Sequence, residues 1–341
     1  MSEPVSPRER QPASQPAGGA APRVTIALIA YKAADTIRAA LDGALAQTVP
    51  CEILVSDDAS PDDTCAVAQA HVAGYSGPHR ITVRRNEVNQ GVTGHLNTLL
   101  AMATGEIVVV MAGDDISKPE RVATLLAAFD ANPDCFVMGS AVDEIGPLGE
   151  PLRQRVQGMP DAFDLHYFVR VGRLATLLGA AMAFRREVFT VFGPLRGRAE
   201  DNILTLRGVL LGHGRCLPQA LVDYRQLPDS LGNWLFARGE KGPDAMRRRY
   251  ERTIVMYRAI ADDLEHALAC LPDLAPERAH EARLITEMYR IEADAREAIL
   301  DRPRREWIAP IWRGLKHPGM RRKSLERAVK LLLPRRVFGL R

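Results

Sequence analysis

Short apolar runs alternate with segments of helical periodicity along the first part of this chain. The apolar runs predict strands near residues 24–30, 53–56, 81–84, 107–111 and 136–140. The segments between them predict helices near residues 36–46, 61–73, 92–103 and 119–131. This alternation is typical of an α/β fold, in which helices cover both faces of a mixed, mostly parallel sheet.

The pattern changes after residue 142. An apolar run at 180–184, a helix over 200–211 and a short strand at 220–224 come next. Beyond about residue 238 the pattern is helical, and one apolar stripe repeats at spacings of four and three: Leu284, Met288, Ile291, Ala295 and Ile299. We therefore expect a disordered tail at 1–22, rich in Pro, Ser, Ala and Gly, a sheet domain at 23–235, and a helical extension at 236–341.

Composition limits the cellular compartments in which the protein is expected. The five cysteines are scattered and contain no CxxC pair, which argues against a disulfide framework or a thiolate zinc site. The apolar stretch 174–184 is shorter than the ~20 residues that a spanning helix needs. We expect a cytoplasmic protein without a membrane-spanning segment.

Two pairs of aspartates follow apolar runs of the predicted sheet. Asp57 and Asp58 end the run EILVSDDAS, and Asp114 and Asp115 end IVVVMAGDDIS. Ligands of open parallel sheets bind beyond the carboxyl ends of the strands, so chemistry is expected there. Adjacent carboxylates repel each other unless a cation or a donor compensates them, and oxygen ligands suit Mg²⁺ or Mn²⁺ on a diphosphate.

The alternative is that these acids only cap the helices that come after them. Ser60, followed by Pro61, already predicts the start of the next helix after the first pair, and Ser117 with Glu120 forms the pattern of a capping box after the second. The aspartates are therefore not needed as caps. For a third acidic pair, Glu200 and Asp201 at a predicted helix start, capping and catalysis are equally good interpretations.

The segment 23–226 resembles the family 2 glycosyltransferases of GT-A fold. The resemblance rests on the order of IALIAYK, EILVSDDASPDDT, NQGVTGHLN, the apolar run into GDDISKPERV, and RAED before a helix. It implies a nucleotide-sugar donor: Tyr31 stacks on the base, Asp58 hydrogen-bonds it, and Asp57 supports that loop. Asn97 and Asp114 are further donor-binding residues by the same resemblance, Asp114 through the sugar or ribose.

The resemblance also implies the chemistry of transfer. Asp115 binds Mn²⁺ or Mg²⁺ on the donor diphosphate, and Asp201, with Glu200 beside it, deprotonates the acceptor hydroxyl, so that the anomeric carbon is inverted. The acceptor is expected to be a saccharide or a lipid-linked sugar of cell-surface polysaccharide, O-antigen or lipopolysaccharide synthesis. A catalytically silent sugar-nucleotide-binding or scaffold protein is the alternative, and the presence of Asp115 and Asp201 argues against it.

Some positions depart from the family pattern. Leu96 stands where many relatives have a phosphate-binding Arg, and His95 could replace that contact or be a surface or capping residue. Tyr224 and Arg225 are not followed by a metal-binding His, and the QxxRW motif of processive synthases is absent. The first strand lacks the GxGxxG loop of dehydrogenases and the glycine-rich loop of nucleotidyltransferases.

The end of the chain is strongly basic. Residues 302–341 contain 13 Lys or Arg and two Glu, against a net charge of +3 for the whole chain. Leu325, Ala328, Val329 and Leu332 fall on one helical face, with Arg327 and Lys330 on another. This pattern favours docking on an anionic membrane at the inner face of the plasma membrane, ahead of a solvated or intersubunit helix and of nucleic acid.

Overall fold

A computed structural model describes residues 22–227 and 244–330 of the chain, with the side chains of the second range described to residue 329. The predicted tail at 1–22 falls almost wholly outside this part, as does the predicted domain boundary at 235–236. The first half of the chain forms the following elements: β1 (Val24–Ala30), α1 (Ile37–Leu45), β2 (Glu52–Asp57), α2 (Thr64–Val72), β3 (Arg80–Arg85), α3 (Gly91–Met102), β4 (Ile107–Ala112), β5 (Ile116–Ser117), α4 (Arg121–Asp130) and β6 (Cys135–Ile145).

The second half adds short strands and long helices. Its elements are β7 (Pro151–Val156), β8 (Ala162–Phe163), α5 (Leu165–Val171), η1 (Gly179–Ala181), β9 (Ala183–Arg185), α6 (Glu187–Thr190), α7 (Glu200–Leu211), β10 (His213–Arg225), α9 (Ala245–Ala269), α10 (Pro276–Asp301), η2 (Arg304–Trp307), α11 (Ile308–Lys316) and α12 (Arg321–Lys330). The predicted helix at 200–211 is confirmed. The predicted strand at 220–224 is only the end of β10, which pairs with β6 from residue 213 onward.

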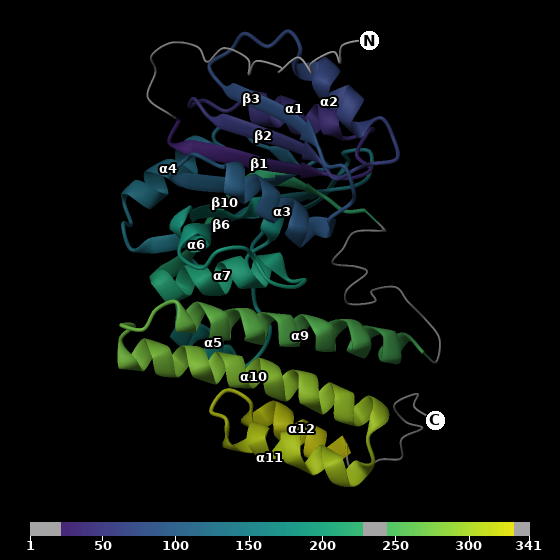
Figure 1. Cartoon of the computed structure of the whole chain (residues 1–341), viewed down its shortest axis with the longest axis vertical. Helices are drawn as coiled ribbons and strands as arrows, with labels where there is room; N and C mark the ends of the chain where they lie inside the picture. Colours follow the sequence, from purple (N-terminus) through teal and green to yellow (C-terminus); the bar gives the residue numbers. More distant parts are fainter. Residues whose placement is uncertain (1–21, 228–243, 331–341) are drawn as a thin grey trace, which may run out of the picture.

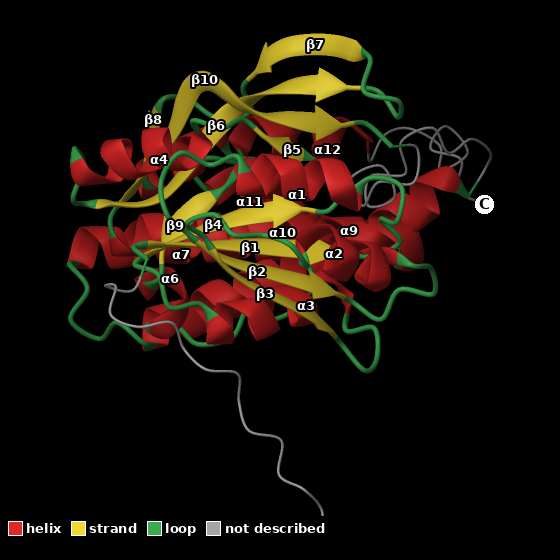
Figure 2. Cartoon of the chain, turned by 90° about the horizontal axis from the view of Figure 1, so that it is seen from above, coloured by secondary structure: helices red, strands yellow, loops and turns green. Residues whose placement is uncertain are grey.

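The strands of the described chain form one mixed sheet in the order β3-β2-β1-β4-β9-β6-β10-β5, with β7 and β8 on its margin (Figure 2). β3, β2, β1 and β4 are parallel neighbours, and β6 is parallel to β10. The short β9 lies antiparallel between β4 and β6. The long strands therefore end at the same edge of the sheet.

Helices cover both faces of this sheet because its central strands are apolar on both sides. Ile107, Val109 and Met111 of β4 pack in one core with α1, α2 and α4. Val108 and Val110, on the opposite side of β4, belong to a second core with α3 and α7. The predicted α/β sheet with helices on both faces is thus confirmed.

The helical extension continues the second core. α9 packs on α7, α10 packs on α9 and α5, and α11 packs on α10 and α12 (Figure 1). Met288, Ile291 and Ala295 of the predicted apolar stripe are buried, whereas Leu284 and Ile299 are partly buried. In the described part of the chain, none of the helices combines the length and the apolar character needed to cross a membrane.

Candidate active site

The three acidic pairs lie on different elements of the sheet domain. Asp57 is the last residue of β2, beside Ala30 of β1. Asp114 and Asp115 come after β4, whose last residue Ala112 lies beside Ile29 of β1. Since these strands are parallel, the first two pairs leave the sheet at the same edge. Glu200 and Asp201 begin α7.

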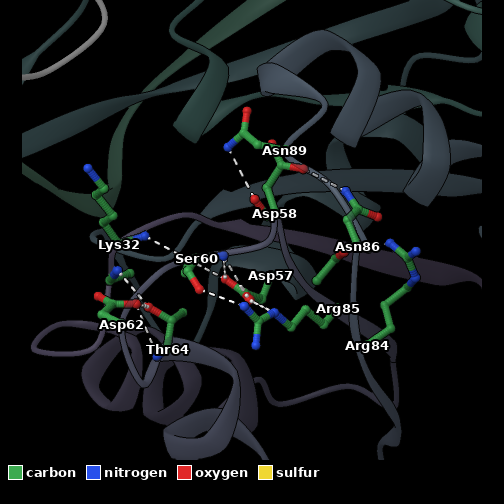
Figure 3. Close-up of polar contacts among 12 residues, drawn as sticks. Lys32, Asp57, Asp58, Ser60, Asp62, Thr64, Arg84, Arg85, Asn86 and Asn89 are labelled. Carbon is green, nitrogen blue, oxygen red and sulfur yellow. Dashed lines mark hydrogen bonds and ion pairs between the residues drawn. The ribbon is translucent and has the colours of Figure 1, made fainter.

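The loop after β2 is held by its own carboxylates (Figure 3). Asp57 is buried, accepts hydrogen bonds from the Ser60 N–H at 3.2 Å and from the Ser60 hydroxyl, and pairs with Arg85 at 3.2 Å. Asp58 is buried as well, and it accepts from the main-chain N–H groups of Gln90 at 2.9 Å and Gly91 at 3.0 Å. Asp57 thus stabilises its own loop, while Asp58 joins that loop to the start of α3.

The predicted caps of the neighbouring helices are wrong. α2 begins only at Thr64, because the Ser60 hydroxyl is bonded to Asp57 and to the Lys32 N–H instead. Ser117 lies in β5, paired with Val222, so its backbone cannot begin a helix, and α4 begins at Arg121. Capping does involve the first pair, but at another helix: Asp58 satisfies N–H groups at the start of α3.

Tyr31 stands at the end of β1 with an exposed side chain. Its exposed fraction is 48%, and the Lys32 ammonium lies 5.4 Å from the centre of its ring. Lys32 has a φ of 54°, in the left-handed region that non-glycine residues rarely adopt. The ring is therefore presented to solvent at the sheet edge, where a flat ligand could stack on it.

Asp115 is buried and only half satisfied. Its Oδ1 accepts a hydrogen bond from the Arg225 N–H at 2.7 Å, while none of the described residues donates to its Oδ2. Burial, and then repulsion from Asp114, raises the pKa of Asp115 well above its usual range. Burial also raises the pKa of Asp114. An oxygen without a donor and two carboxyls that resist ionisation fit a pair that receives a cation from outside the chain.

Two buried arginines lie near this pair. Arg225 donates from Nε to the Asp114 carbonyl at 2.9 Å, and its Nη1 reaches the carbonyls of Gly146 and Pro147. Arg121 is fully buried and donates to the carbonyls of Val110 and Ala180, each at 2.9 Å. Burial lowers the pKa of Arg121 to about 10, which Asp115 partly opposes. Both arginine side chains donate hydrogen bonds to main-chain carbonyls. They therefore offset the negative charge of Asp114 and Asp115 only in part.

The third pair also resists ionisation. Burial, and then the charge of Glu200, raises the pKa of Asp201 to about 8. Burial raises the pKa of Glu200, which accepts from the Thr93 hydroxyl at 3.2 Å. Gly179 lies directly against Asp201: a Cβ on that glycine would stand 2.2 Å from Oδ1. The N-cap of α7 is Ala199, with no side-chain capping hydrogen bond, and a catalytic role for Asp201 stays a prediction.

Tyr224, near the end of β10, brings the second and third pairs together. Burial, and then the charges of Asp115, Asp114 and Asp201 in that order, raise the pKa of its phenol to about 12. One side chain is therefore within electrostatic reach of three carboxylates that come from two separate segments of the chain. In the sequence, Tyr224 and Arg225 stood out only because no metal-binding His comes after them, although a Tyr-Arg pair closing the last strand was a signal that could have marked them.

Asn97 has a different environment from the one predicted. Its Nδ2 donates to the Leu195 carbonyl at 3.0 Å, and its Oδ1 accepts from the Leu195 N–H at 2.8 Å. The amide thus binds the main chain of the segment that leads into α7. The predicted contact of Asn97 with the nucleotide-sugar donor stays a prediction. His95 is buried, with its pKa lowered by burial, so it is neither a surface nor a capping residue.

In the described part of the chain, protein groups alone do not form a complete metal site. Among residues 22–227 and 244–330, no group of three or more His, Cys, Asp and Glu side chains is placed to hold an ion. Asp114 and Asp115 could supply at most part of a coordination shell, so the rest would have to come from a ligand.

The mixed sheet, with carboxylate pairs at the carboxyl edge of its strands, defines an α/β domain of GT-A type. A solved structure of similar fold, TarS residues 1–349 of S. aureus in complex with UDP-GlcNAc, has a TM-score of 0.57 and 18% sequence identity, covering 87% of this chain and 82% of that one. The model of the family "Glycosyl transferase family 2" matches residues 25–192. Residues 25–192 of the sheet domain therefore belong to glycosyl transferase family 2.

Curated relatives agree with this family. EpsE of Bacillus subtilis strain 168 is 30% identical over 132 residues, which is 38% of this chain and 47% of that protein. The succinoglycan biosynthesis protein ExoU of Rhizobium meliloti strain 1021 is 38% identical over 104 residues, 30% of each chain. The amylovoran biosynthesis glycosyltransferase AmsE of Erwinia amylovora is 28% identical over 161 residues, 45% of this chain and 59% of that protein. The chain thus spans about half the length or less of these first relatives and 59% of AmsE.

Proposed function

We propose that the protein is an inverting glycosyltransferase that moves a sugar from a nucleotide-diphosphate sugar to an acceptor hydroxyl. The observation that carries this proposal is that Tyr224 lies within electrostatic reach of Asp114, Asp115 and Asp201. Donor and acceptor chemistry need acids of two kinds, one set that offsets diphosphate charge and one that takes a proton. The site offers both.

Asp201 is the proposed base. The acceptor hydroxyl gives its proton to the Asp201 carboxylate, its oxygen bonds to the anomeric carbon, and the bond from that carbon to the diphosphate oxygen breaks with its electrons on the nucleotide. A carboxyl whose pKa is raised to about 8 holds a proton more strongly than a solvated aspartate, which suits this transfer near neutral pH. Gly179 leaves the space in which Oδ1 of Asp201 lies.

Asp115, with Asp114 beside it, is the proposed site of Mn²⁺ or Mg²⁺. The Asp115 Oδ2 without a donor and the oxygen chemistry of both side chains fit such an ion, and diphosphate oxygens would complete its shell. When bound, the ion offsets the charge that develops on the leaving diphosphate. The Arg225 N–H holds Oδ1 of Asp115 through its hydrogen bond at 2.7 Å, which leaves Oδ2 for the ion.

Tyr31 and Asp58 are the proposed contacts of the nucleotide base, which we take to be that of a UDP- or dTDP-sugar. Asp58 is buried and bonded to the start of α3, so it would offer the base its remaining lone pairs. The UDP-GlcNAc bound by TarS supports this class of donor. The names of ExoU and AmsE support a saccharide or lipid-linked acceptor in cell-surface polysaccharide synthesis.

A donor panel tests the proposal. Release of nucleoside diphosphate is measured for UDP-, dTDP- and GDP-sugars with Mn²⁺, Mg²⁺ or EDTA, in the wild type, Asp115→Ala and Asp201→Asn. We expect one donor class to be turned over only with metal, loss of donor binding in Asp115→Ala, and retained binding without turnover in Asp201→Asn. Absence of nucleotide-sugar binding under every condition would contradict the proposal. Binding without turnover in the wild type would favour the alternative, a silent sugar-nucleotide-binding or scaffold protein.

A further inference from the structure

Exposed apolar side chains gather at the end of the helical extension. Among the described residues, four of the large hydrophobic side chains with high exposure lie on two adjacent helices, and their exposed fractions are 57–60%. We call them the hairpin patch: Ile308 and Trp312 of α11, and Leu325 and Val329 of α12. Such an exposed group calls for an explanation, because single exposed hydrophobics are common but clusters mark interaction sites.

The patch belongs to the outer side of both helices. In each helix its two members are four residues apart and so share one face. The other faces are buried: Pro310, Ile311 and Gly314 of α11 face inward, as do Ser324 and Arg327 of α12. α11 and α12 pack together and form the end of the molecule opposite β3 (Figure 1). A surface that approaches this end meets the two helices before the sheet.

The basic residues of this region divide into two groups. Some are used within the protein: Arg313 bonds Glu287 and Asp294, while Lys323 and Arg327 both reach Glu292. Their charges therefore have a structural explanation.

Others lie on the outside around the patch. Arg305, Lys316 and Arg321 are exposed to differing degrees, and the Lys316 ammonium lies 5.2 Å from the centre of the Trp312 ring. The helical face predicted from sequence is corrected in part: Leu325 and Val329 do point outward, but Ala328 is partly buried and Arg327 faces inward to Glu292. Leu332 and the side chain of Lys330 lie outside the described residues.

We propose that the hairpin patch docks the protein on a bilayer that contains anionic lipid. A tryptophan and three aliphatic side chains can enter the interfacial region of a bilayer, while the surrounding Lys and Arg side chains meet anionic headgroups. The exposed Arg305, Lys316 and Arg321 give this end of the molecule positive charges that complement anionic lipid headgroups. This inference is independent of the proposed sugar transfer.

Sedimentation with vesicles tests the inference on the full chain. Phosphatidylcholine vesicles are compared with vesicles containing about one quarter phosphatidylglycerol, which supply the anionic surface. We expect binding to the anionic vesicles that weakens as salt is raised. Trp312→Ser with Leu325→Ser is expected to reduce this binding at least about tenfold, since two large apolar side chains are lost. Lys316→Glu with Arg321→Glu is expected to weaken it to a similar degree and to remove the salt dependence.

The matched control is Val255→Ser. Val255 lies on α9, outside the hairpin patch, and its exposed fraction of 60% is similar to that of the patch residues. We expect this variant to bind vesicles like the wild type. Equal losses in all variants, or no binding of the wild type, would overturn the inference, as would patch variants that change only self-association in light scattering. The charge variant leaves the apolar packing of the helices intact, so it decides the matter if the double serine variant does not fold.

Discussion

Buried acids have opposite surroundings in the two regions of this molecule. At the sheet edge, Asp115 and Asp201 have pKa values raised by burial and by a neighbouring acid. In the helical extension, Glu292 is only 1% exposed, yet Arg327, Arg296 and Lys323 overcome the effect of burial and lower its pKa to about 2. The extension compensates Glu292 completely from within the chain, whereas the surroundings of Asp115 and Asp201 do not compensate these two acids.

The difference separates a structural carboxylate from a functional one. Glu292 holds α10 to α12 through Lys323 and Arg327, and nothing else is needed to stabilise its charge. The acids at the sheet edge have few cations near them, and those cations are bonded to main-chain carbonyls. Such a site is less stable when empty than when it receives a cation or a proton, which is what the proposed reaction supplies.

Replacement of Asp201 should have the largest effect on activity. We expect Asp201→Asn to lower kcat about 10³-fold, since proton transfer by a positioned base contributes about 10²–10⁴-fold. The free energy of unfolding should not fall, because the variant removes a carboxyl that is disfavoured as an anion in the fold. Initial rates and urea unfolding measure the two quantities, and Asp262→Asn, an exposed acid on α9, serves as the control. A variant that unfolds more easily would place Asp201 with the structural acids.

The pH dependence of wild-type kcat should also show that Asp201 acts as the base. A base acts only when it is deprotonated, so with a pKa of about 8 for Asp201 the activity should rise as the pH increases toward about 8. An activity that is constant from about pH 5 to 9 would contradict this assignment.

Replacement of Glu292 should have the largest effect on stability. Glu292→Gln leaves Arg296, Lys323 and Arg327 without their anion, and breaking a buried ion pair costs about 3–5 kcal/mol. Glu297→Gln is the control, because this more exposed acid pairs with Arg258 and Arg302 at the surface and should cost less than about 1 kcal/mol. Urea unfolding gives both values, and equal costs would argue against a special role for Glu292.

The loss of stability at low pH should also identify Glu292 as a structural acid. Because the folded pKa of Glu292 is depressed, its stabilising contribution is present above its ordinary value of 4.5 and is lost as the pH falls toward about 2. In Glu292→Gln this part of the acid-induced loss of stability should be missing.

An intermediate effect is expected at Gly179. Gly179→Ala places a Cβ 2.2 Å from Oδ1 of Asp201, so the carboxyl must move. We expect kcat to fall about 10²-fold with little change in the KM for donor, since small displacements of a reacting group cost this much. Gly158→Ala, where a Cβ meets nothing within 4 Å, should behave like the wild type. A change confined to donor KM would show that Gly179 lines the donor site instead.

The smallest effect is expected at Asn97. Asn97→Ala removes both hydrogen bonds to Leu195 and loosens the segment that leads to Asp201. We expect a decrease of kcat of about tenfold and an unchanged donor KM, because the loss of positioning acts on the base. A donor KM that rises while kcat is kept would support the donor contact predicted from sequence. Thr98→Ala, on the same helix, is the control.

The main strands and the acidic pairs could be predicted from the sequence, whereas the helix caps and the direction of Arg327 depend on tertiary contacts. The apolar runs located the main strands because a buried strand must be apolar on both sides, and the doubled acids marked the sheet edge. The caps at Ser60 and Ser117 were wrong because both residues have partners far away in the sequence, the Lys32 N–H and the Val222 backbone, that no local pattern contains. The inward turn of Arg327 was missed for the same reason: its partner Glu292 lies 35 residues away.

The central claim is that Asp114 and Asp115 await a cation, and calorimetric titration of Mn²⁺ in the presence of UDP tests it most directly. Asp115 has a raised pKa, so bound metal should displace a proton from the carboxyl, and the measured heat should depend on the ionisation enthalpy of the buffer. We expect binding with proton release in the wild type and neither in Asp115→Asn. Binding that is unchanged in Asp115→Asn, or no binding of Mn²⁺ by the wild type, would contradict the account.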